Sequence, residues 1–297
     1  MSFRVQCAIA PLAFALLASQ PLLAAPAPTP AGATGFRLGT LQLFALRDMD
    51  NVVPNDGSVF GVGVPKPEVS KVLQQAHAPA DRISLSVDAL LVRMPGHVVL
   101  LDTGLGPKIG GSLMASLAAA HVRPEDVTDI LITHSHGDHV GGLATRDGAL
   151  AFPKATIRMS ATEWSYMQAK GSKALVETIR AKVQPFKPGA EVVPGITSVP
   201  LAGHTPGHSG YEIRSDNARL LDIGDSAHSS IISLARPDWT IEYDGNGAQG
   251  RANRKALLAK LATDHERIFA PHFPYPGVGF VEKTGEGSYR WAPALPR

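Results

Sequence analysis

His134, His136, Asp138 and His139 lie within six residues of one another and follow an apolar run that predicts a strand over Asp129–Thr133. Side chains at positions i and i+2 leaving a strand point to the same side, so His134 and His136 are placed to bind one ion while Asp138 and His139 face a second. Imidazole nitrogens and carboxylate oxygens without sulfur suit zinc, with manganese, iron or cobalt as substitutes. The alternative is a polar loop with a helix-capping aspartate and surface histidines, and this density of ligand types argues against it.

Three later segments each place one metal-capable side chain at the end of an apolar run. These side chains are His204 in Gly203–His208, Asp225 after Leu220–Ile223, and His272 after Ile268–Ala270. Taken alone, each is more often a capping or surface residue. Their weight comes from occurring together with the first cluster.

The elements that must position these residues alternate between strands and helices. Strands are expected over Leu38–Leu46, Ser86–Arg93, His97–Leu101, Asp129–Thr133, Ala155–Met159, Thr197–Leu201, Ser209–Ile213, Ala218–Ile223 and Arg267–Ala270. Helices are expected over Ser112–Ala120, from Val140, and over Ala161–Lys170, Ser172–Val183 and Arg251–Ala262. The segment Asp48–Arg82, rich in Gly, Pro and Val, predicts a long loop. Two similar halves of this kind predict two packed sheets with helices outside.

Composition favours one large globular domain. The chain has 297 residues, 44% of them hydrophobic and 18% charged, which excludes a disordered or coiled-coil protein. A net charge of +2 without a basic run excludes a nucleic-acid partner, and a small-molecule substrate is expected instead.

The N-terminus predicts export. Arg4, an apolar run to Leu23 and the small residues Ala24 and Ala25 indicate a signal peptide over residues 1–24. A retained membrane anchor is less favoured, and no membrane association is expected after cleavage. A flexible Pro/Ala linker is predicted over 25–35 and the folded domain over 36–297. The single cysteine, Cys7, lies in the signal segment, so the mature chain has no disulfide or thiolate metal site. Localisation is expected to be periplasmic or extracellular.

Taken together, the chain resembles the metallo-β-lactamase superfamily, whose His-x-His-x-Asp-His signature is complete here. The resemblance covers residues 36–297 and implies an α/β (α+β) fold, an αββα four-layer sandwich of two mixed sheets with helices on the outer faces. It implies that His134, His136 and His204 bind one zinc ion, that Asp138, His139 and His272 bind the other, and that Asp225 bridges the two. It also implies that Asp102 orients a ligating histidine and that His208 supports the site from behind the ligands.

The chemistry implied is hydrolysis by a metal-bridging hydroxide, with Asp225 holding both ions and either Asp138 or a second water as the proton carrier to the leaving group. Within the superfamily the chain is most similar to the branch of methyl parathion hydrolase and exported lactonases. The strings that carry this likeness are Leu101–Gly104, Val193–Ile196 and His272–Gly279. A small ester, lactone or organophosphate triester is therefore the expected substrate, and relatives in that branch tend to be homodimers.

Several alternatives remain beside this branch. They are a glyoxalase II-like thioesterase, a β-lactamase-like amide hydrolase, an iron redox enzyme and a non-catalytic metal-binding protein. Candidate pocket walls, each of which could equally be core, are Trp164, Phe60, Phe186, His228, Trp239 and Phe273.

Overall fold

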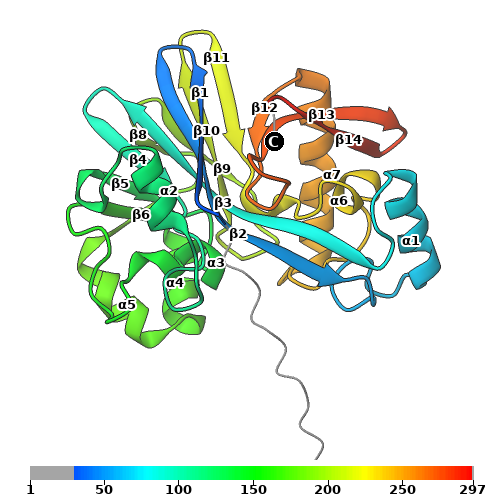
Figure 1. Cartoon of the computed structure of the whole chain (residues 1–297), viewed down its shortest axis with the longest axis horizontal. Coiled ribbons are helices and arrows are strands. Elements are labelled where there is room, and N and C mark those ends of the chain that lie inside the picture. The colour runs from blue at the N-terminus through cyan, green and yellow to red at the C-terminus, as the bar shows by residue number, and fades with distance from the viewer. Residues whose placement is uncertain (1–29, 296–297) are drawn as a thin grey trace, which may run out of the picture.

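Two seven-stranded sheets pack face to face in the computed structural model, which describes residues 30–295, and helices cover their outer faces (Figure 1). This arrangement confirms the predicted αββα sandwich. The predicted signal peptide and the linker residues up to 29 lie outside the described residues. Among those described, no helix combines the length and apolar character needed to span a bilayer.

The N-terminal sheet has the order β1-β2-β3-β4-β5-β6-β7 and is mixed, because β4 to β7 pair in parallel and the remaining strands pair antiparallel. Its strands are β1 (Gly32–Leu38), β2 (Leu41–Pro54), β3 (Arg82–Met94), β4 (His97–Leu101), β5 (Asp129–Leu131), β6 (Thr156–Ser160) and β7 (Val183–Phe186). β3 and β4 form a hairpin in which Met94 pairs with His97.

The C-terminal sheet has the order β14-β13-β12-β11-β10-β9-β8, in which only β11 and β12 pair in parallel among the strands described. Its strands are β8 (Glu191–Val193), β9 (Ile196–Pro200), β10 (Ser209–Ser215), β11 (Ala218–Asp222), β12 (Arg267–Phe269), β13 (Val278–Gly285) and β14 (Ser288–Pro293). The parallel pair brings the ends of β11 and β12 to the same edge of the sheet.

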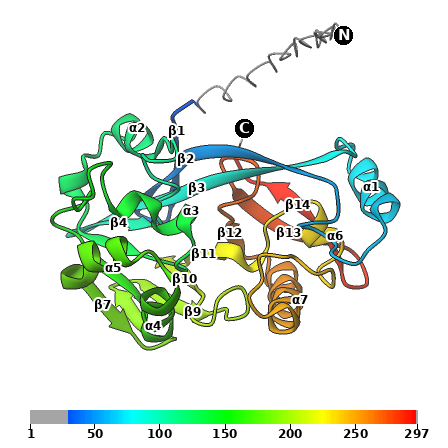
Figure 2. The same cartoon turned by 90° about the horizontal axis from the view of Figure 1, so that it is seen from below.

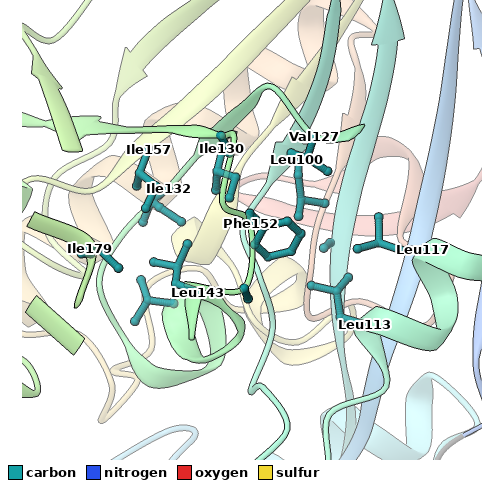
Figure 3. Close-up of a cluster of buried hydrophobic side chains, with 14 of the residues drawn as sticks. Leu100, Leu113, Leu117, Val127, Ile130, Ile132, Leu143, Phe152, Ile157 and Ile179 are labelled. Atoms are coloured by element: carbon teal, nitrogen blue, oxygen red, sulfur yellow. The ribbon is translucent and has the colours of Figure 1, made fainter. Parts of the chain in front are cut away.

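Helices form the outer layers. They are α1 (Lys66–Gln75), α2 (Leu113–Ala119), α3 (Gly137–Val140), α4 (Ala161–Lys170), α5 (Lys173–Ile179), α6 (Ile232–Ala235) and α7 (Gly247–Asp264), with short 3-10 turns at Pro124–Asp126, Gly141–Leu143, Arg180–Lys182 and Gly224–Ser226. Leu113, Leu117 and Ile179 pack with the outer face of the N-terminal sheet (Figure 3). On the other side Leu257, Leu258 and Leu261 of α7 pack on the C-terminal sheet. A third apolar cluster lies between the two sheets.

The predicted loop over Asp48–Arg82 is wrong, because β2 extends to Pro54 and pairs with β3 as far as Arg82. This β2–β3 ribbon reaches past the sheet to α1 (Figure 2). Helix α1 buries Val69 and Leu73, one turn apart, in a separate apolar cluster with Phe60, Trp239 and Ile241. A short apolar stripe between glycines and prolines was too weak a signal to predict the helix.

The domain begins earlier than predicted, because Gly32–Gly35, assigned to the linker, belong to β1 and pair with β2. The predicted strand Leu38–Leu46 includes the turn between these strands, where Gly39 has a φ of 56°. The helix expected from Val140 ends there instead. Gly141 and Gly142 follow in close contact with the backbone of Leu105 and Thr103.

Candidate metal centre

The metal-capable side chains meet at one edge of the sandwich, because each follows the end of a strand. The segment with His134 and His136 follows β5 and continues into α3, which carries Asp138 and His139. From the other sheet, His204 lies between β9 and β10, Asp225 lies in the 3-10 turn after β11, and His272 follows β12. The two sheets therefore contribute to one site.

Three of these histidines form the group that we call the histidine trio, namely His134, His136 and His204. Nε2 of His204 lies 2.9 Å from Nδ1 of His136 and 3.2 Å from Nε2 of His134, and the last two nitrogens are 3.1 Å apart. Two nitrogen ligands of a tetrahedral zinc ion, each about 2.0–2.1 Å from the metal, lie roughly 3.4 Å apart. The trio therefore has nearly the spacing of one face of a zinc site.

A second group, which we call the acidic group, contains Asp138, His139 and His272. Oδ2 of Asp138 lies 3.7 Å from Nε2 of His139 and 3.5 Å from Nε2 of His272. The Asp225 carboxylate lies between the two groups. Its Oδ1 is 3.2 Å from His139 Nε2, and its Oδ2 is 3.1 Å from His272 Nε2 and 3.3 Å from His204 Nε2. This is the position that a carboxylate shared by two ions would need.

Two of the ring nitrogens that face away from the centre have the following hydrogen-bond partners. Nδ1 of His139 lies 2.7 Å from Oδ2 of Asp102, and Nδ1 of His272 lies 2.7 Å from the Ser86 carbonyl oxygen. Acceptors in these positions hold a proton on Nδ1, so Nε2 is the ring nitrogen left to bind a cation at the centre. Asp102, predicted to orient a ligand histidine, is thus in hydrogen-bond contact with His139.

The ring of His208 contacts the main chain beside the centre. Its Nδ1 is 2.9 Å from the Leu201 carbonyl oxygen, and its Nε2 accepts a hydrogen bond from the backbone N–H of Asp225 at 3.0 Å. Burial, reinforced by the charge of His204, lowers the pKa of His208 to about 3. The neutral ring therefore fixes the backbone of Asp225.

Burial lowers the pKa of all three members of the histidine trio, which favours the neutral form that binds a cation. In the acidic group, the pKa values of the two histidines are raised instead. Burial alone would lower the pKa of His272, but the charge and the hydrogen bond of Asp225 and the charge of Asp138 together outweigh it and raise the pKa to about 9. The same balance raises the pKa of His139 well above its usual value. In the metal-free chain these two rings carry protons that a bound cation would displace.

The donor set fits a pair of metal ions. His139 Nε2 and Asp225 Oδ1 are buried and have no hydrogen-bond partner among the described residues, although they lie only 3.2 Å apart. Buried polar atoms left unpaired are costly, and several of them aimed at one point indicate a missing partner. A cation between them supplies that partner.

An open cavity of about 400 Å³ lies over this centre. It is lined by Asn51, Leu85, Val87, His136, Gly137, Asp138, His204, Asp225, His228, Tyr243 and His272. Leu85 and Val87 are on the same face of β3, so the ribbon gives the cavity an apolar wall.

A sequence profile of the metallo-beta-lactamase superfamily matches residues 83–272, which hold every side chain of the histidine trio and of the acidic group. The chain belongs to the metallo-β-lactamase superfamily.

Two solved structures resemble this metallo-β-lactamase domain over most of its length. AidC, described as a dizinc quorum-quenching lactonase in complex with a product, has a TM-score of 0.83 and 27% identity over 90% of this chain and 99% of that chain. The hydrolase AbOPH has a TM-score of 0.82 and 29% identity over 91% and 99%.

Relatives with curated sequences match more locally. YobT of Bacillus subtilis is 29% identical over 136 residues, which is 42% of this chain and 56% of YobT. A probable metallo-hydrolase of Mycobacterium tuberculosis is 27% identical over 189 residues, 48% of this chain and 57% of the relative. The matched region spans about half the length of these two relatives.

Most of the aromatic residues proposed as pocket walls pack elsewhere in this metallo-β-lactamase domain. Phe273 is buried under α7 and packs edge-on against Trp291 at 5.0 Å, and Trp164 packs on the outer core of the N-terminal sheet. Phe186 contacts the inter-sheet core, and Trp239 belongs to the cluster around α1. A packed core buries more of the apolar surface of these aromatic side chains than an open cavity would.

His228 does line the cavity. Its ring is parallel to that of His272 at 5.3 Å, and its Nε2 lies 3.0 Å from Oδ2 of Asp225. Neither ring nitrogen has a hydrogen-bond partner among the described residues. Phe60 does not line the cavity, but it packs edge-on against His228 with a ring-centroid distance of 6.5 Å.

Some residues of this metallo-β-lactamase site were not predicted. The buried side chain of Asp244 has its Oδ1 3.3 Å from Nδ1 of His204. It is placed to accept a hydrogen bond from that ring, as Asp102 is from His139. Asn51 and Leu85 were missed because their segments were assigned to a loop or left outside a strand. Tyr243 and Asp244 lie outside any motif, and no spacing in the sequence connects them to His204.

Proposed function

We propose that the chain is a metal-dependent hydrolase that uses two divalent ions, zinc in the first instance, to cleave a small ester, lactone or organophosphate triester. The observation that carries this proposal is the Asp225 carboxylate, which lies between the histidine trio and the acidic group beneath an open cavity. Bound there, two zinc ions would supply a water nucleophile at neutral pH and stabilise negative charge on a carbonyl or phosphoryl oxygen.

The chain's own residues divide the work. The histidine trio would hold one ion and the acidic group the other, and Asp225 lies where it could serve either. Asp138 is suited to move a proton to the leaving group, because its side chain is 30% exposed and lines the cavity. His228 lines the cavity, and neither of its ring nitrogens has a hydrogen-bond partner among the described residues, so the ring is suited to donate a hydrogen bond to an oxygen of the substrate.

The cavity supports a small substrate with an apolar part. Its volume of about 400 Å³ is at the small end of ligand pockets, and Leu85 and Val87 offer apolar contact beside the polar centre. Similarity to AidC over 90% of this chain favours a lactone within the proposed class. The same centre serves esters and phosphotriesters, since all three reactions need a water nucleophile and a stabilised oxyanion.

Export and assembly are further parts of the proposal. Residues 1–24 have the sequence of a signal peptide, which supports a periplasmic or extracellular enzyme. N-terminal sequencing of the secreted protein tests this, and light scattering on the mature chain tests the homodimer that the branch resemblance suggests.

The test is a paired assay on zinc-reconstituted mature protein, with an aryl phosphotriester and an acyl lactone as substrates. His134→Ala and Asp225→Ala serve as controls. Turnover of either substrate that disappears in both variants supports the proposal, and the ratio of kcat/KM values ranks the substrate classes. Fully metallated protein that hydrolyses neither substrate, nor a simple aryl ester, contradicts it.

A further inference from the structure

Glu163 is a buried carboxylate that is not one of the candidate metal ligands described above. It lies in the first turn of α4, on the outer side of the N-terminal sheet (Figure 1), and none of its side chain is exposed. A buried charge is costly unless its oxygens are fully hydrogen-bonded. The position of its partners shows what this carboxylate connects.

One carboxylate oxygen binds the loop that carries His134 and His136. Oε1 accepts hydrogen bonds from the backbone N–H of Ser135 at 2.7 Å and from the Ser135 hydroxyl at 2.6 Å. Ser135 is the residue between the two histidines. Its main chain is therefore fixed at the point where the two ligand side chains diverge.

The other oxygen binds the loop that carries His204 and His208. Oε2 accepts from the Thr205 hydroxyl at 2.7 Å and from the backbone N–H of Gly207 at 3.1 Å. All four donors are uncharged, and together they occupy the acceptor capacity of one carboxylate. Glu163 thus joins two loops that come from different sheets.

The helix start reinforces this connection. The Ser160 hydroxyl caps α4 by accepting from the Glu163 N–H at 3.1 Å, and it donates to the Gly207 carbonyl oxygen at 2.8 Å. Gly207 approaches so closely that a Cβ at this position would be 2.2 Å from the Glu163 nitrogen. The loop and the helix are in direct backbone contact here.

We infer that Glu163 is a positioning residue that holds the histidine trio at ligand spacing and so sets the metal affinity of that group. Two members of the trio come from one loop and one from the other, so their spacing depends on the connection between the loops. The acidic group depends on it less, because His272 is fixed by the Ser86 carbonyl instead. This inference rests on the proposed two-metal function.

Glu163→Gln tests the inference at nearly constant volume. In either orientation of the amide, its NH₂ group faces the backbone N–H of Ser135 or of Gly207. A backbone N–H can only donate, so one hydrogen bond is lost. Zn²⁺ binding to the intact mature chain is measured by competition with a chromophoric chelator, and Co²⁺ spectra report the ligand environment of each site. Glu177→Gln, an exposed glutamate on α5 paired with Arg180, is the matched control.

In Glu163→Gln we expect the affinity for one of the two zinc equivalents to fall about 10-fold to 100-fold, and the affinity for the other to stay within about threefold of the wild-type value. This is about the effect of losing a hydrogen-bond partner of a metal ligand. Activity at limiting zinc falls and recovers when zinc is raised. The double variant Ser135→Ala/Thr205→Val keeps both backbone bonds, so a smaller loss at the same equivalent is expected, and it provides the test if Glu163→Gln does not fold.

The outcomes separate this inference from the function on which it rests. One result would overturn only the role of Glu163. In it, the wild-type protein binds two zinc ions, Glu163→Gln leaves both affinities unchanged or weakens them equally, and the double variant leaves both unchanged. Wild-type protein that binds no zinc overturns the proposed function and this inference with it.

Discussion

Asp102 and His139 form a buried hydrogen bond of 2.7 Å between Oδ2 and Nδ1. The same carboxylate accepts from the backbone N–H of Thr133 at 2.8 Å and from its hydroxyl at 2.7 Å. Asp102 has a φ of 60°, a conformation that few side chains adopt without compensation. The carboxylate is therefore held rigidly, and it fixes both the orientation and the proton position of the His139 ring.

Asp102→Asn is expected to weaken metal binding by the acidic group. If the amide oxygen keeps the bond to the Thr133 N–H, its NH₂ faces His139 Nδ1 and favours the tautomer that carries the proton on Nε2, where a cation must bind. Loss of such a partner costs about 10-fold to 100-fold in affinity. Zinc content after dialysis measures the effect, with Asp129→Asn at the start of β5 as control. Unchanged zinc affinity in Asp102→Asn would show that the carboxylate does not set the tautomer.

His228→Phe is expected to separate catalysis from metal binding. The ring remains to stack on His272, but both nitrogens are lost. If His228 donates to the substrate, kcat falls by about 100-fold or more while zinc content stays at the wild-type value. Parallel measurement of kcat, KM and bound zinc decides this. Loss of zinc together with activity would instead assign His228 to the metal ligands, as its position 3.0 Å from Asp225 also allows.

Leu85→Ala tests the apolar wall supplied by the β2–β3 ribbon. For a substrate with an apolar chain we expect KM to rise about 10-fold with little change in kcat, because the contact is present in the ground state and in the transition state alike. Ile83→Ala is the matched control. Both side chains are buried on the same face of β3, but Ile83 does not line the cavity over the centre. Equal effects of the two variants on KM would indicate a general loss of packing.

The metal-ligand candidates could be proposed from the sequence because His134 to His139 follow one strand in a dense pattern and the remaining candidates each end an apolar run. The residues that hold them could not all be found this way. Glu163 and Asp244 act on loops 28 and 40 residues away in the chain, and only folding brings them there.

The β2–β3 ribbon escaped prediction for a different reason. Asp50, Asn51 and Val52 are all exposed, so the strand lacks the alternation that marks a half-buried sheet. Pairing with β3, rather than side-chain pattern, keeps the segment extended. The apolar cavity wall carried by Leu85 was therefore missed together with the ribbon.

His208 gives the metal-free protein a component of stability that depends on pH. Burial lowers its pKa to about 3, whereas the unfolded ring titrates near its ordinary value of 6.5. Between these values the unfolded chain binds one more proton than the folded chain, so this component is present above pH 6.5 and is lost as the pH falls toward 3. His208→Gln removes the titration and keeps an acceptor for the Asp225 N–H. Urea unfolding of chelator-treated protein from pH 7 to pH 4 should show a shallower slope in the variant, by up to about 1.4 kcal/mol per pH unit. Parallel profiles for wild type and variant would mean that His208 titrates normally in the folded chain.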